Sequence, residues 1–556
     1  MFAATAAFFG AFFLFPIWNT VREAFVDGDG NFTLGFVGAI FRNPIYLEGL
    51  VNAFKMGLFS TLASLLIALP LALVANRYRF PGKDVLTSLL LVPMILPPFV
   101  GALGVRQFLG QMGVLNTLLI DLGLMNPDKP FDWMGDGQLF GVVLMNALHL
   151  YPIAYLNISA ALANLDPAME EAAENLGCHG LRRLWRVTFP LIMPGVFAGS
   201  TIIFIWSFTE LGVPLIFDYS RVTSVQIFDG IKELSGNPLP YALVVVMLVT
   251  TVLLYIVSKA LFGRESYAGS GRASTGRTLE TAKPLAGLCY TVMFVATIGV
   301  AILPHVGVIL LSMAGDWYGT LLPSEFTAQH YIDALGHPLT VHSIANSLKY
   351  ASFSTLFDIV LGIAIAWVVV RTKLPGRNLL DALAMLPLAV PGLVLAFGYF
   401  ALAQEGQPFH PLILGEDPVV ILVIAYAVRR LPYVVRSAAA GYQQTNVSLE
   451  EAAQNLGSTP FRALKRVTLP LIAANLIAGG LLAFSFAMLE VSDSLILAEQ
   501  AQHFPITKAI YALVSSLGNG HYLASALGVW AMAFLAVTIV GAGLILGQKL
   551  GALFRV

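Results

Sequence analysis

The chain has 556 residues, of which 57% are hydrophobic and only 11% are charged, and its formal net charge is −1. A soluble domain carries about 25% charged residues, so this composition excludes an ordinary soluble protein. The near-zero net charge gives no reason to expect nucleic-acid binding, and two cysteines are too few for a disulfide framework.

Twelve apolar stretches are long enough to cross a bilayer as helices, for which roughly 20 residues are needed. They predict an all-α polytopic membrane protein with about 12 transmembrane helices, in contact with membrane lipid. The alternating pattern of a transmembrane barrel is missing. The first stretch lacks a preceding basic region and a clear cleavage site, so we expect an uncleaved span rather than a signal peptide. The predicted spans are about 2–22, 50–75, 85–110, 138–160, 190–213, 240–262, 285–312, 342–370, 379–403, 418–440, 470–491 and 522–546.

A Gly-, Ser- and Thr-rich segment, residues 264–283, is expected to be a flexible linker. It separates a first six-span domain, residues 1–263, from a second, residues 284–556, and the two repeat one another. For example, "RVTFPLI" at 186–192 returns as "RVTLPLI" at 466–472. Because six spans separate the copies, both have the same topology, which predicts a parallel repeat.

Lys and Arg are divided unevenly between the two sets of loops. One set contains the linker and basic clusters around Arg77, Arg183 and Arg466. The opposite set contains Arg42, Lys129, Arg221, Lys232 and Lys508. Since positive loops stay inside, this bias places the linker and both termini on the cytoplasmic side of a bacterial inner membrane.

A short polar motif is duplicated between the fourth and fifth spans of each half. "EEAAENLG" at 170–177 returns as "EEAAQNLG" at 450–457. Asp166 can cap the first helix, and Ser448 with Glu451 forms a capping-box pattern in the second. A second basic helix with an apolar stripe follows in each copy, so the loop is predicted to be a two-helix knob with exposed charges.

The simplest interpretation of one such loop is a solvated connector. A connector needs solubility rather than a particular sequence, and the match between the two copies extends through both the acidic and the basic helix. Two matching copies therefore favour a pseudo-symmetric partner with two equivalent sockets.

The two loops resemble the EAA loop of ABC-importer permeases: Glu-Ala-Ala, then Gly, then a hydrophobic and basic stretch ending in Pro190 or Pro470. The resemblance covers nearly the whole chain, as two fused type I permease domains. It implies that the short helices are coupling helices, which dock on two copies of a cytoplasmic ABC ATP-binding subunit. It also implies a periplasmic or lipoprotein solute-binding protein and transport by alternating access. The coupling residues so implied are Glu170, Glu171, Ala172, Ala173, Gly177, Glu450, Glu451, Ala452, Ala453 and Gly457.

The chain has no G-x-x-x-x-G-K-[ST] motif, so ATP would have to be hydrolysed by another chain. Its nine histidines and two cysteines show no metal-ligand spacing, and no Ser/His/Asp pattern rises above chance. We therefore expect a transport subunit and not an enzyme, with no catalytic residues, no cofactor and no metal site.

Ionisable residues inside predicted spans are candidates for the lining of a solute path. The alternative is that they form pairs between helices or reach water at the interface. For Glu210 and Glu490 the two interpretations have equal weight, and for Asp358 the alternative has more. Prolines at 93, 97, 387 and 391 are expected to break the third span of each half and expose backbone. The path candidates are His149, Glu210, Arg429, Arg430 and Glu490.

Fused twelve-span permeases of this kind resemble the ferric iron importer branch, and "AYAVRRLPYVVRSAAAGY" at 425–442 is most similar to its ferric members. This resemblance implies import of ferric iron, free or chelated; thiamine or a phosphonate such as 2-aminoethylphosphonate is the alternative. Arg429 and Arg430 near a pore would repel bare Fe(III) but suit an anionic chelate or a phosphonate. An ion-coupled secondary transporter, which can also have parallel repeats, is the alternative class. A membrane enzyme is the third possibility, and the missing catalytic pattern speaks against it.

Overall fold

A computed structural model describes residues 2–95, 97–134, 138–233, 237–262, 279–413 and 417–545. These residues are almost entirely helical, and the strands among them are the two-residue β1 (Tyr78–Arg79) and β2 (Glu280–Thr281), which pair in parallel. The all-α prediction is confirmed. Of the predicted linker, residues 264–278 lie outside the described residues.

All twelve predicted spans coincide with helices. Nine helical stretches in the described part of the chain are long and apolar enough to cross a membrane, and two more spans are bent helix pairs. The remaining span, predicted at 418–440, is α21 (Val419–Gln444), which is less apolar than the others because it carries Arg429, Arg430 and Arg436. The nine stretches are Phe2–Phe25, Pro44–Arg77, Gln138–Ala163, Gly180–Phe208, Leu239–Val257, Pro284–Met313, Pro338–Arg371, Pro460–Met488 and Gly520–Ile539.

The third span of each half is broken at its prolines, as predicted. Lys83–Met94 meets Pro98–Asp121 at 95°, and Arg377–Leu388 meets Gly392–Ala403 at 96°. Pro97 and Pro391 are extended at the breaks, with ψ of 124° and 136°. Proline lacks an N–H and clashes with the preceding helical turn, so the chain turns sharply and restarts as a new helix.

The helices named below have these bounds: α1 Phe2–Phe9, α2 Phe15–Phe25, α4 Pro44–Arg77, α5 Lys83–Leu89, α6 Val92–Ile95, α7 Pro98–Leu109, α9 Gln138–Ala163, α10 Pro167–Asn175, α11 Gly180–Arg183, η2 Leu184–Thr188, α12 Phe189–Phe208, α13 Gly212–Ile216, α16 Pro284–Met313, α18 Pro338–Arg371, α20 Gly392–Ala403, α22 Val447–Asn455, α23 Pro460–Ala463, η6 Leu464–Thr468, α24 Leu469–Met488, α25 Ser492–Leu497, α26 Ile506–Val514 and α27 Gly520–Ile545.

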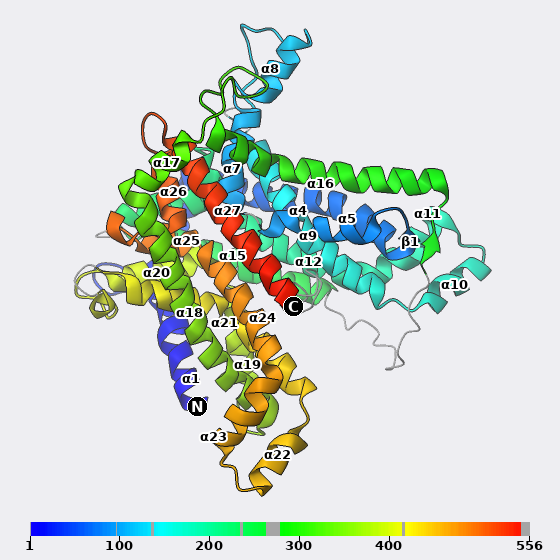
Figure 1. The fold of residues 1–556 in the computed structure, drawn as a ribbon. Helices are drawn as coiled ribbons and strands as arrows, with labels where there is room; N and C mark the ends of the chain where they lie inside the picture. The colour runs from blue at the N-terminus through cyan, green and yellow to red at the C-terminus, as the bar shows by residue number, and fades with distance from the viewer. Residues whose placement is uncertain are drawn as a thin grey trace. The chain divides into compact units, whose positions relative to one another are not determined.

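The chain divides into two compact units that do not follow the two sequence repeats. As a result, α1 and α2 belong to the unit built mainly from the second half, whereas α16 belongs to the unit built mainly from the first half. Figure 1 shows α16 running alongside α5, which it contacts. The first helix of each repeat has thus been exchanged. Unit 1 comprises Met1–Leu47, Ser224–Leu248 and Thr327–Val556, and unit 2 comprises Glu48–Thr223 and Val249–Phe326.

Each exchanged helix is seated on an equivalent glycine of the broken third span. In unit 2, a Cβ on Gly104 of α7 would lie 1.8 Å from the carbonyl oxygen of Pro304 on α16. In unit 1, a Cβ on Gly398 of α20 would lie 3.0 Å from Pro16 on α2. Small residues let helix backbones approach closely in a membrane, so these glycines fix where the exchanged helices pack.

Each unit has its own apolar core. In unit 2, Tyr151, Ile158 and Ile203 pack with Phe294 of the exchanged helix. In unit 1, Ala366, Ala438 and Tyr442 pack with residues of α24. Each core includes residues at the border of its unit's duplicated loop: Leu165 and Phe189 in unit 2, and Leu464 and Leu469 in unit 1.

Candidate functional site: two helical knobs and a buried charge cluster

Both duplicated loops form the predicted two-helix knobs. Knob 1 is residues 166–188 (α10, α11 and η2) and knob 2 is residues 446–468 (α22, α23 and η6); Figure 1 shows each projecting from its own unit. Asp166 caps α10 as predicted, its carboxylate accepting from the Ala168 N–H at 3.0 Å. The Ser448 capping box is wrong, because Asn446 occupies the cap instead and accepts from the Ser448 N–H at 3.1 Å. Asn is as good a cap as Ser or Asp, and a cap two residues earlier lengthens the helix.

Each acidic helix ends at its glycine, as the sequence predicts. Gly177 and Gly457 are left-handed, with φ of +81° and +85°. In knob 1 the Gly177 N–H donates to the Glu174 carbonyl and the Cys178 N–H to the Ala173 carbonyl, both at 2.9 Å. Knob 2 repeats this pattern. The glycines therefore form Schellman caps, which any residue with a Cβ would strain.

The first glutamate of each motif points inward, so the expectation that the acidic pair faces water is wrong for Glu170. Glu170 is 5% exposed, and its Oε1 accepts from the Thr188 hydroxyl at 2.6 Å. Thr188 ends the π-helical turn η2, which leads into α12. Knob 1 is therefore tied to the fifth span of its half, while Glu171 is exposed.

Knob 2 is tied to a different span. Arg371, the last residue of α18, donates from Nε to Glu450 Oε1 at 3.2 Å and from Nη2 to the Thr445 carbonyl at 2.8 Å. Its guanidinium also lies 5.5 Å from the centre of the Tyr442 ring. The Arg371 and Glu450 side chains are 7% and 14% exposed, so this ion pair is well shielded. The second span of its half therefore holds knob 2.

The residue that aligns with Arg371 in the first half is Arg77, and it has another partner. Arg77 Nε lies 3.5 Å from Glu280, which belongs to β2 at the end of the predicted linker. The pairing of β1 with β2 brings the two side chains together. The two knobs therefore share a shape but differ in their anchors.

The tip of each knob exposes apolar side chains. Leu176 is 87% exposed and Leu456 is 90% exposed, and Leu181 and Phe461 are each 75% exposed. Ala172 and Ala452 are also exposed, whereas Ala173 and Ala453 are half-buried. Large apolar side chains exposed together, at equivalent places in both copies, are typical of a protein interaction site.

The arginines predicted for the solute path form a buried cluster with acidic residues. Glu490 pairs through Oε1 with Arg429 and through Oε2 with Arg430. Asp493 of α25 lies 3.4 Å from Arg429. Arg430 also donates to the Phe486 carbonyl of α24 at 3.2 Å. These contacts link α21, α24 and α25. The ionisable residues therefore form pairs between helices, which was the alternative that the sequence left open.

Two aligned residues of the fourth spans sit on the broken third spans. In unit 1, the Arg429 guanidinium fills the space beside Gly392, where a Cβ would lie 2.1 Å from its Cζ. In unit 2, the buried His149 ring lies 2.8 Å from the Pro93 carbonyl oxygen. The breaks predicted from proline therefore receive a polar side chain in each half.

Glu210 aligns with Glu490 but has a different environment. Its Oε1 accepts from the Gly212 and Val213 N–H groups at 3.0 and 3.3 Å, at the start of α13. The path candidates thus fall into two groups: Arg429, Arg430 and Glu490 in unit 1, and His149 and Glu210 in unit 2.

The sequence analysis assigned no site role to three further polar residues. His305 of α16 is 3% exposed and lies beside Gly101 of α7. Lys508 of α26 donates to the Leu495 carbonyl at 2.5 Å, and burial lowers the pKa of its amine to about 8. Glu280 falls at the linker's end. Only the internal alignment of Arg77 with Arg371 could have drawn attention to Glu280.

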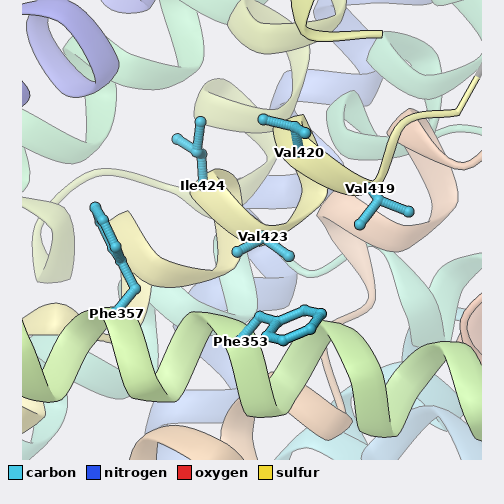
Figure 2. Close-up of a pocket in the computed structure, with 6 residues that line it drawn as sticks. All are labelled: Phe353, Phe357, Val419, Val420, Val423 and Ile424. Carbon is cyan, nitrogen blue, oxygen red and sulfur yellow. The ribbon is translucent and has the colours of Figure 1, made fainter. Parts of the chain in front are cut away.

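A pocket of about 300 Å³ lies between α18 and α21, lined by carbon alone. Figure 2 shows Phe353 and Phe357 on α18 facing valine and isoleucine side chains of α21. Phe353 is 53% exposed. This lining suits acyl chains and lacks the polar groups that would hold an ion, so the pocket is no candidate for the solute path.

The fold and the two knobs define a multi-pass membrane transport component. Residues 64–265 and 358–547 each match the family described as binding-protein-dependent transport system inner membrane component. The chain therefore belongs to this family, and the repeat of the sequence is a repeat of its domain. Membership implies ATP-binding and solute-binding partners.

Among known relatives, the chain is 28% identical to the ferric transport system permease protein FbpB of Actinobacillus pleuropneumoniae, over 82% of this chain and 64% of the relative. It is 24% identical to the Fe(3+)-transport system permease protein FbpB 2 of Haemophilus influenzae, over 83% of each chain. A shorter match, 29% identical over 34% of this chain and 68% of the relative, is to the spermidine/putrescine permease PotB of Haemophilus influenzae.

Proposed function

We propose that the chain is the membrane-spanning permease of an ATP-driven importer, with both termini in the cytoplasm. It moves a small solute, delivered by an extracytoplasmic binding protein, into the cell by alternating access. The observation that carries this proposal is the pair of knobs. Each has a rigid helical frame, an inward anchor through Glu170 or Glu450, and an exposed leucine at its tip.

In this proposal the knobs are coupling helices, each docked on one copy of a separate ATP-binding subunit. A leucine that is about nine-tenths exposed gains about 2 kcal/mol when a partner cleft buries it. Its helix is meanwhile fixed to a span by a charged hydrogen bond. Closure of the ATP-binding subunits would therefore pull on α12 through knob 1 and on α18 through knob 2.

For the solute we propose ferric iron, free or chelated. The ferric relatives match along more than four-fifths of this chain. Arg429 and Arg430 do not repel Fe(III) as unpaired cations would, because Glu490 and Asp493 neutralise them at short range. Thiamine or 2-aminoethylphosphonate, carried by the same machinery, is the alternative solute.

An ion-coupled secondary transporter is the alternative class, favoured by a buried intramembrane carboxylate, Asp358. The two proposals separate in proteoliposomes. An importer moves solute only with its ATP-binding subunit, binding protein and ATP present. Uphill transport by the purified chain alone, driven by a proton gradient, would overturn our proposal.

Docking of the knobs has its own test. Leu176→Ser together with Leu456→Ser should abolish copurification of the ATP-binding subunit without unfolding the chain, because both side chains are exposed. Leu517→Ser is the matched control, since Leu517 is 98% exposed in a loop outside both knobs. Equal loss of the subunit from the control, or none from the double variant, would count against docking at the tips.

The glycine caps allow a second test of coupling. No atom of the described residues lies within 4 Å of a Cβ built on Gly177 or Gly457, so among these residues only the left-handed backbone opposes a side chain there. Gly177→Ala with Gly457→Ala should raise ATP hydrolysis relative to transport, because alanine disfavours this conformation by about 1–2 kcal/mol. The same pair changed to Asn, which tolerates it better, should keep the two activities coupled.

A further inference from the structure

Asp358 of α18 is a carboxyl group buried inside a membrane-spanning helix. It is 0% exposed, and neither carboxyl oxygen has a hydrogen-bond partner in the described part of the chain. One turn away, α18 and α21 pack tightly, since a Cβ on Gly362 would lie 2.7 Å from Val434. The residue aligned with Asp358 in the first half is Ser64, which is also fully buried but neutral.

The charges around Asp358 are balanced without it. The guanidinium groups of Arg429 and Arg430 are matched by the carboxylates of Glu490 and Asp493. The amine of Lys508 does not add to this balance, because it points to the Leu495 carbonyl and faces Glu499 and Lys232. An ionised Asp358 would therefore leave one uncompensated negative charge in the membrane interior, which costs several kcal/mol.

The other titratable groups near Asp358 do not supply a compensating positive charge. Arg430 is the charged group that faces it from α21. Three buried phenols on α18, α20 and α21 of the same unit already have partners for their hydroxyls: Tyr350 with the His503 carbonyl, Tyr399 with the Phe12 carbonyl, and Tyr426 with Ser494.

We propose that Asp358 is a proton-binding site, neutral in this conformation because it carries one proton. Asp358 and Asp493 are the two carboxyls near Arg429 and Arg430 with the fewest hydrogen-bond partners, and Asp358 is the better position for that proton. Asp493 keeps an ion contact with Arg429 through Oδ2, whereas neither oxygen of Asp358 has a hydrogen-bond partner in the part of the chain that the structure describes. An ionised carboxylate needs several donors, so the carboxyl without any is the one that binds the proton.

Release of this proton would give Arg430 a second carboxylate as an acceptor. Its Nη2 is held by Glu490 and the Phe486 carbonyl, but its Nε has no acceptor among the described residues. When the proton leaves to water, the new carboxylate on α18 competes with Glu490 for the guanidinium. The protonation state of Asp358 thereby influences which helix holds α21. With the proton bound, Glu490 holds α21 to the end of α24, and without it Asp358 can hold α21 to α18. This last step rests on the proposed alternating access; the proton site itself does not.

Infrared spectroscopy of the purified full-length chain in lipid nanodiscs tests the proton site directly. At neutral pH the wild type should show the C=O stretch of a protonated, non-hydrogen-bonded carboxylic acid, which Asp358→Asn removes and Asp493→Asn retains. Should Asp358→Asn fail to fold, Asp358→Ser copies the residue of the first half. Absence of the band, its survival in the Asp358 variant, or its appearance only when Na⁺ is removed would each overturn the proposal.

Transport measurements separate this inference from the proposed function. If both hold, Asp358→Asn should still couple ATP hydrolysis to transport, but it should lose the pH dependence of transport that is expected of the wild type. If the chain fails to associate with an ATP-binding subunit, the proposed function fails, yet the infrared band is still expected. Unchanged pH dependence in the variant would refute the link between the proton and the transport cycle.

Discussion

The unequal anchoring of the two knobs gives a quantitative prediction. Arg371→Ala removes the ion-pair partner that Glu450 has in the described part of the chain, a pair whose members are 7% and 14% exposed. It also removes the hydrogen bond to the Thr445 carbonyl at 2.8 Å. Breaking a buried pair costs 3–5 kcal/mol, and since Glu450 retains some contact with water we take about 3 kcal/mol. That corresponds to roughly a 100-fold shift in the equilibrium between docked and undocked α22.

Hydrogen exchange of backbone amides, followed by mass spectrometry in nanodiscs, measures this shift. Peptides from α22 should exchange up to roughly 100-fold faster in Arg371→Ala, whereas peptides from α10 should be unchanged. Arg77→Ala is the matched control, because Arg77 pairs with Glu280 and not with the acidic helix of knob 1. It should loosen β1 and β2 and leave α10 protected. Equal effects of the two variants on their knobs would refute the idea of different anchors.

Three further predictions concern the anchors, the exchanged helices and pH. Thr188→Val should lower the free energy that holds α10 in place by about 1.5–3 kcal/mol, the contribution of a hydrogen bond to a charged group. In the same exchange assay Thr468→Val should have no effect, since the Thr468 hydroxyl has no partner among the described residues. Gly104→Ala should lower the free energy of unfolding by about 3 kcal/mol or more, as overpacking against backbone does. Gly299→Ala should not, because no described atom lies within 4 Å of a Cβ there. Equal melting temperatures of the two variants would contradict the close approach at Gly104. Lys508 keeps its proton to higher pH when unfolded than in the folded chain, where its pKa is about 8. Unfolding therefore takes up a proton between about pH 8 and 10.5, and the wild type should gain stability relative to Lys508→Met as the pH rises through that window; a constant or falling difference would refute it.

Much of the local structure could be predicted from the sequence. Apolar length gave the twelve spans, because a bilayer imposes about 20 residues on any helix that crosses it. Proline predicted both breaks of the third spans, and glycine the ends of both acidic helices, because these residues act on the backbone at their own position. The same local logic failed at Ser448, because Asn446, two residues earlier, can also cap the helix and does so.

The assignments of pairs were beyond the sequence. Arg429 and Arg430 stood out as unusual charges in a span, but Glu490 is about sixty residues away, and only the packing of α21 against α24 brings the three together. Likewise, aligned residues have different partners in the two halves: Glu170 binds Thr188, whereas Glu450 binds Arg371.

The sequence by itself determined that this chain is a helical membrane protein with a duplicated domain and a duplicated knob. Hydropathy, repeats and caps depend on residues that are close together in the sequence. Only the tertiary structure decided that the first helix of each repeat packs in the other unit, against Gly104 or Gly398. It also decided that the two knobs are anchored to different spans, and that Asp358 has no hydrogen-bond partner among the described residues. The physical reason is that hydropathy acts on each helix separately, whereas close backbone contacts and buried charges depend on which helices meet.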